Sequence, residues 1–88
     1  MFIAYEVSLE VVRALRTVVP QIESQDRDLA DQLRRAASSV VLNLAEGQRL
    51  VKGNKPKHYA IAHGSANEVR AALQTAIAWA GSKSQLRR

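Results

Sequence analysis

The residues of this chain that are best suited to binding chemistry are its lysines and arginines. Residues 47–57 (GQRLVKGNKPK) contain four of them and no acid. Ammonium and guanidinium groups neutralise phosphates, so a segment of this composition suits a nucleic-acid backbone. The candidate nucleic-acid-binding residues are the cations of this segment, the histidine that follows it and the basic residues near the C-terminus: Arg49, Lys52, Lys55, Lys57, His58, Lys83, Arg87 and Arg88.

The distribution of charge points to the same kind of partner. The 88 residues include 13 Lys or Arg and eight Asp or Glu, a net charge of +5. Residues 44–88 hold eight of the basic residues against Glu46 and Glu68 alone, whereas residues 1–43 are about neutral. Such asymmetry is typical of a surface that binds a polyanion, most simply nucleic acid. The alternative is that the basic surface only keeps a small protein soluble.

Metal, disulfide and membrane chemistry have little support. His58 and His63 are five residues apart, which places them about 140° apart around a helix, and the chain has no cysteine. We therefore expect no metal site. The longest uncharged stretch, residues 71–82, is shorter than the roughly 20 residues that span a bilayer. Because the N-terminus also lacks the basic start of a signal peptide, we expect a cytoplasmic protein without membrane contact.

Two carboxylates could be imagined as an acid–base pair. Glu46 and Glu68 are the acids of the basic half of the chain. The stronger interpretation is that they tie the second predicted helix to the third, through Asn43 or Arg70. No nucleophile has a base at short range, so we expect no enzymatic activity and no cofactor.

Hydrophobic periodicity predicts an all-α fold, an up-and-down bundle of helices. The first helix covers about residues 3–19 and ends at Pro20, which biases the preceding residue out of the helical region. The third covers about residues 55–80, with Pro56 in its first turn, and a disordered basic tail of residues 81–88 follows. The apolar seam of the third helix is Tyr59, Ala62, Ala66, Val69, Leu73, Ala76 and Ala80.

The second helix, about residues 26–50, completes a bundle domain that spans residues 1–80. Ser24 and Asp26 are its candidate N-caps, and the acidic residues around them favour the positive end of the helix dipole. Its segment 36–45 carries no charge on any face. We therefore expect this segment to be enclosed on all sides, by its own chain and by neighbouring subunits.

Two stretches of these helices are specific enough to identify a family. Residues 32–47 (QLRRAASSVVLNLAEG) and residues 61–69 (IAHGSANEV) occur in the order and at the distance of two family hallmarks. The chain resembles the four-helix bundle proteins encoded by intervening sequences in 23S ribosomal RNA genes. The matching motif positions are carried over as structural positions: Asn43, Glu46, Gly47, Gly64, Ser65 and Glu68.

This resemblance implies an antiparallel four-helix bundle that assembles into a ring, typically a pentamer. It also implies kinship with the basic accessory proteins of diversity-generating retroelements, which bind nucleic acid and a reverse transcriptase. Because only eight residues follow Ala80, either the fourth helix is short or missing, or another subunit completes the bundle. Gly64, which lies inside the third helix, is expected to permit a close helix crossing.

We therefore predict a non-enzymatic oligomer that binds structured RNA through its backbone. The aromatic residues are scattered, so no stacking platform is expected and base-specific readout is small. A chain of this length buries only about 60–65% of its unfolded surface, which favours oligomerisation. The alternative is a protein-interaction adaptor whose uncovered apolar groove accepts a partner helix.

Overall fold

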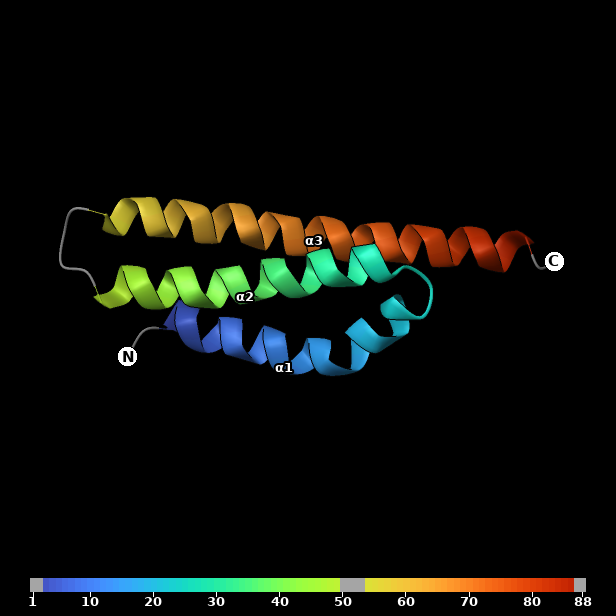
Figure 1. The fold of residues 1–88 in the computed structure, drawn as a ribbon, viewed down its shortest axis with the longest axis horizontal. Coiled ribbons are helices and arrows are strands. Elements are labelled where there is room, and N and C mark those ends of the chain that lie inside the picture. Colours follow the sequence, from blue (N-terminus) through green and yellow to red (C-terminus); the bar gives the residue numbers. More distant parts are fainter. Residues whose placement is uncertain (1–2, 50–53, 87–88) are drawn as a thin grey trace.

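The computed structural model describes residues 3–49 and 54–86, which form three helices in up-and-down order (Figure 1). They are α1 (Ile3–Glu23), α2 (Arg27–Arg49) and α3 (Lys55–Leu86). The middle helix α2 packs against both of the others. The predicted all-α class is confirmed, but these residues form three helices, without the fourth that the family resemblance implies.

The first helix is longer than expected, because Pro20 does not end it. α1 continues for another turn to Glu23, with the proline exposed inside it. Proline removes one backbone hydrogen bond from a helix, yet the extra turn buries Ile22 in the core. The burial of that side chain offsets part of the cost of the proline. Figure 1 shows α1 changing direction in its last turns.

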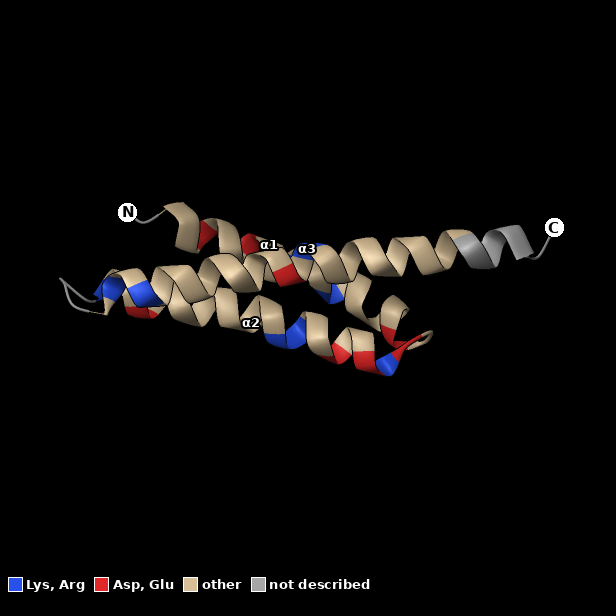
Figure 2. Ribbon diagram, turned by 90° about the horizontal axis from the view of Figure 1, so that it is seen from above, with Lys and Arg blue, Asp and Glu red and all other residues tan. Residues whose placement is uncertain are grey.

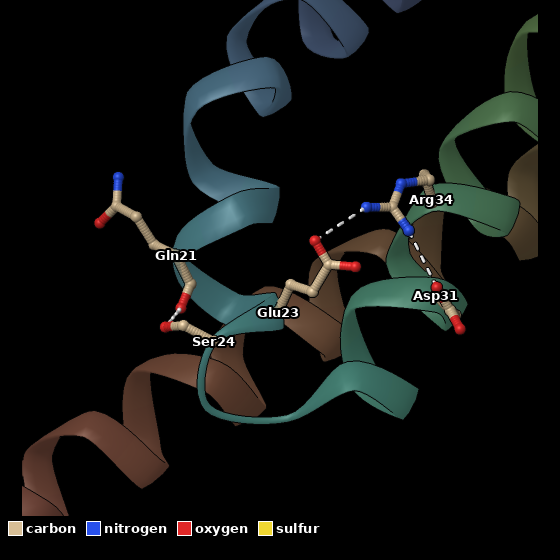
Figure 3. Close-up of polar contacts among 5 residues, drawn as sticks. All are labelled: Gln21, Glu23, Ser24, Asp31 and Arg34. Atoms are coloured by element: carbon tan, nitrogen blue, oxygen red, sulfur yellow. Dashed lines mark hydrogen bonds and ion pairs between the residues drawn. The ribbon is translucent and has the colours of Figure 1, made fainter.

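The turn between α1 and α2 is closed by side chains on both sides. Oδ1 of Asp26 accepts a hydrogen bond of 3.0 Å from the backbone N–H of Leu29, so Asp26 is the N-cap of α2. Ser24, the other candidate, serves α1 instead: its hydroxyl donates to the carbonyl of Gln21 at 2.8 Å (Figure 3). Each helix end therefore has its own polar partner.

The core lies where the C-terminal half of α1 meets α2 and the middle of α3. Its buried members are Leu15, Val19, Ile22, Ala30, Leu33, Ala36, Ala37, Val69 and Ala72. Four of these are alanines, which let the helix axes approach closely. Of the predicted seam of α3, Ala62 and Val69 are buried, whereas Ala66 is exposed.

One chain covers only one side of the uncharged segment of α2. Ala36 and Ala37 are buried, but Ser38 is exposed and Leu42 keeps 64% of its surface exposed. The single chain therefore provides only part of the enclosure expected for this segment. Cover from a neighbouring subunit remains a prediction.

The third helix also exceeds its predicted bounds. α3 runs to Leu86 instead of ending near Ala80, so the expected disordered tail begins as helix. The residues after Gly81 include no proline, and a single glycine costs a helix only about 1 kcal/mol. The end of α3 projects past the turn between α1 and α2 (Figure 1), and its Ile77 and Trp79 are 72% and 65% exposed. Within residues 3–49 and 54–86, no helix is both long and apolar enough to cross a bilayer.

Candidate nucleic-acid interface

Three of the predicted cations gather where α2 ends and α3 begins. Arg49 is the last residue of α2, and Lys55 and Lys57 lie in the first turn of α3 (Figure 2). We call these three residues the basic end. Lys52, Arg87 and Arg88 lie outside the described residues, so their placement remains a prediction.

Arg49 is exposed but engaged with a carboxylate of its own helix. Its Nε donates a hydrogen bond to Oε2 of Glu46 at 3.1 Å and its Nη2 donates another to Oε1 at 3.1 Å, so the guanidinium engages both carboxylate oxygens. Hydrogen bonding and the charge of the guanidinium lower the pKa of the Glu46 carboxyl, and the pKa of Arg49 is raised in return. Glu46 therefore partners Arg49 within α2 and does not tie α2 to α3 as expected.

The two lysines differ in their surroundings. The Nζ of Lys55 lies 5.7 Å from the centroid of the Tyr59 ring, a cation–π distance. Lys57 is exposed. Both lie at the N-terminus of α3, where the helix dipole is positive and the first turn contains no acid. The lysines and the dipole therefore add to one positive potential.

His58, expected to contact phosphates, instead joins the two helices of the hairpin. Its Nδ1 lies 2.9 Å from Oδ1 of Asn43. The Nδ2 of Asn43 donates to the backbone carbonyl of Ser39 at 2.9 Å, and Ser65 donates to the Ser39 hydroxyl at 2.8 Å. A chain of polar contacts thus runs between α2 and α3 behind the basic end.

Ser39 is the member of this chain that sequence reasoning did not select. A signal was present: Ser39 and Asn43 are four residues apart in α2, so they share one helix face. His58 and Ser65 are seven apart in α3 and share a face in the same way. Two polar pairs on facing stripes are what an interhelical hydrogen-bond chain requires.

The motif glycines have opposite surroundings. Gly47 is buried, and a Cβ built there would lie 2.6 Å from Cδ1 of Tyr59. Within the described part of one chain, no helix approaches Gly64 closely, since nothing lies within 4 Å of a Cβ built at that position. The close contact between the helices is therefore at Gly47. Glu68, the remaining motif carboxylate, is exposed.

Lys83, a candidate from the basic C-terminal residues, does not lie beside the basic end. Lys83 belongs to the last turns of α3, at the opposite end of the molecule from Lys55 (Figure 1). At 1.5 Å per residue the two lie about 40 Å apart along the helix. The acids, in contrast, concentrate near the turn between α1 and α2 (Figure 2).

The described part of the chain contains no group of three side chains able to hold a metal ion. This end of the hairpin carries cations at two helix ends, with Lys55 over the Tyr59 ring and the His58–Asn43 contact joining the two helices. Such an arrangement can neutralise phosphates.

Comparison with known protein families gives the same family as the two hallmark stretches do. A sequence model of the family described as 23S rRNA-intervening sequence protein matches residues 2–88. The chain belongs to this family. No curated protein and no solved structure matches it. In this 23S rRNA-intervening sequence protein, the hallmark positions Asn43, Gly47 and Ser65 are contact points between α2 and α3.

Proposed function

We propose that this member of the 23S rRNA-intervening sequence protein family is a non-enzymatic, RNA-binding homo-oligomer. The expected assembly is a pentamer, as the family resemblance implies. The observation that carries the proposal is the basic end, where Arg49, Lys55 and Lys57 meet at one end of an elongated molecule. At the other end of α2, the turn from α1 is acidic in composition, with Glu23, Asp26, Asp28 and Asp31 against Arg27, and Lys83 of α3 lies beyond it. A polyanion would orient such a molecule with the basic end toward it.

The positions of the lysines strengthen this argument. A cation in the first turn of a helix is disfavoured by about 0.3–1 kcal/mol, because it faces the positive end of the dipole. Lys55 and Lys57 both occupy that turn. A bound phosphate would offset the repulsion between these lysines and the helix dipole, and it would accept hydrogen bonds from the backbone N–H groups of the first turn.

Recognition would proceed through the RNA backbone. Tyr59, the aromatic residue nearest the basic end, already packs against Gly47 and beneath Lys55. It is therefore not available as a stacking platform for bases. We expect affinity for structured RNA with little dependence on sequence, and each additional protomer in an assembly adds another basic end.

A second candidate function, protein interaction, is favoured by the projecting end of α3. Ile77 and Trp79 are exposed there on a helix segment without charge between residues 71 and 82. The two side chains are two residues apart, so they point to different sides of the helix and a partner would have to wrap around this end to cover both. The adaptor function would use this surface and leave the basic end dispensable.

RNA binding can be tested with a double variant and a matched control. Lys55→Gln/Lys57→Gln should weaken binding of a labelled RNA hairpin at low salt about tenfold or more, as measured by fluorescence polarisation. Arg27→Gln/Arg70→Gln removes the same charge from exposed positions outside the basic end and should change affinity less than about threefold. Equal effects of the two variants, or no binding at low salt, would overturn the proposal and favour the adaptor.

A further inference from the structure

Two adjoining depressions lie between α1 and α2 and on the neighbouring surface of α2. The first lies between the helices and is lined by Val12, Leu15, Arg16, Val19, Pro20, Arg34, Ala37 and Ser38. The second is a shallow depression on α2, lined by Arg34, Arg35, Ser38, Ser39, Leu42 and Asn43. We call the two depressions, which share Arg34 and Ser38, the α1–α2 groove.

The groove combines an apolar floor with a basic rim. Within the described residues, Arg16 and Arg35 form no ion pair. Arg34 is shared between Asp31 at 2.9 Å and Glu23 at 3.7 Å (Figure 3). An occupant of this groove should therefore present aliphatic side chains bordered by carboxylates.

The chain itself carries such an element on the opposite edge of α1. Ile3, Val7 and Val11 recur every four residues and are 71%, 54% and 40% exposed. We call them the α1 ridge. Val7 and Arg16 are nine residues apart, which places them about 180° apart around the helix, so ridge and groove rim lie on opposite edges of α1.

Carboxylates border the ridge on its solvent side. Glu6 and Glu10 follow the same helical spacing one residue before Val7 and Val11. Glu10 is paired with Arg13, whereas Glu6 forms no ion pair within the described residues. The ridge thus has an apolar centre like the floor of the groove, and an acidic border opposite in charge to the basic rim of the groove.

We infer that the α1 ridge of one copy docks in the α1–α2 groove of the next, with Glu6 facing the arginines of the groove rim. This inference rests on the self-association part of the proposed function and specifies its interface. An RNA would leave the apolar floor unused, whereas a second copy covers the floor and matches the rim charges. Because ridge and groove are different surfaces, the contact is head-to-tail, and it adds copies either to a closed ring or to an open filament.

The interface is tested by breaking each surface alone and then mixing the products. Val7→Asp disables the ridge, and Leu42→Asp disables the groove; both side chains are exposed in one chain, so the helices should still form. Ile61→Asp, at an exposed apolar residue outside both surfaces, is the matched control. Native mass spectrometry should give monomers for the first two variants and the wild-type mass for the control. Mixing the two monomers should give a heterodimer and nothing larger, because one intact ridge then meets one intact groove.

Charge reversal provides a second test that leaves the apolar surfaces alone. Glu6→Arg/Glu10→Arg and Arg16→Glu/Arg35→Glu should each reduce the oligomer fraction, and an equimolar mixture of the two should recover it in part. If both Val7→Asp and Leu42→Asp still form the wild-type assembly, the proposed interface is wrong but self-association stands. A monomeric wild type would overturn self-association as well. RNA affinity, measured separately on the same proteins, would keep the RNA-binding proposal distinct from either failure.

Discussion

The His58 ring and the Asn43 amide, 2.9 Å apart, assign each other's hydrogen-bonding roles. The Nδ2 of Asn43 donates to the backbone carbonyl of Ser39, which can only accept. The amide oxygen must therefore face His58, and His58 Nδ1 carries the proton of this contact. His58 is thus the residue that joins α3 to α2 directly beside the cations, and it sets the position of Lys55 and Lys57 through its own helix.

Removing the amide should destabilise the hairpin. Asn43→Ala leaves a half-buried His58 N–H without its partner and deletes the contact with Ser39. We expect the free energy of unfolding to fall by about 1–3 kcal/mol in chemical denaturation. Asn67→Ala, at an exposed position of α3, should change it by less than about 0.5 kcal/mol. Equal losses of stability in the two variants would show that the His58–Asn43 hydrogen bond does not stabilise the hairpin.

Substitution by alanine should change the free energy of unfolding in opposite directions at the two motif glycines. Gly47→Ala forces a Cβ against the ring of Tyr59 and should cost about 1–3 kcal/mol. Gly64→Ala meets open space and should stabilise α3 by up to about 1 kcal/mol through helix propensity. Thermal unfolding of both variants beside the wild type measures the difference. If Gly64→Ala lowers the unfolding temperature, another group must approach Gly64 closely. Because nothing in the described part of the same chain does so, that group would belong to a neighbouring copy.

The pairing of Glu46 with Arg49 predicts a specific pH dependence. Hydrogen bonding and charge from Arg49 hold the pKa of the Glu46 carboxyl below its usual value. A carboxyl with a lowered folded-state pKa contributes stability above its unfolded-state pKa, and this contribution disappears as pH falls through the folded-state value. Arg49→Gln should raise the pKa of Glu46 toward its usual value, as followed by NMR titration of the side-chain carboxyl. An unchanged titration would mean that the ion pair does not persist in solution.

Local signals predicted the elements of the fold well and their ends less well. The N-cap at Asp26 and the early position of Pro56 in α3 follow from backbone chemistry within a few residues, and both are confirmed. Pro20 misled the prediction because its local preference competes with burial of Ile22, which depends on where α2 lies. The end of α3 was misplaced since its polar composition, the basis for the predicted tail, does not exclude a helix.

The candidate site shows the same division between local and tertiary information. Composition alone found the cations of the basic end. It could not show that Arg49 shares its charge with Glu46, or that Lys83 lies at the far end of a continuous helix. Likewise, Gly64 and Gly47 are both helical glycines in sequence, and only the position of Tyr59 shows which one is needed.

Salt dependence should distinguish phosphate contacts from any other role of the basic end. If phosphates are the ligands, the logarithm of RNA affinity falls linearly with the logarithm of salt concentration, by about 0.7–0.9 per contact. Lys55→Gln/Lys57→Gln should therefore reduce the slope by about 1.4–1.8 for each protomer engaged, and by the same amount for RNA hairpins of unrelated sequence. The measurement is a binding titration at four or more salt concentrations, with Arg27→Gln/Arg70→Gln expected to keep the wild-type slope. A double variant that weakens binding without changing the slope would mean that the lysines act on the structure of the hairpin and not on the RNA.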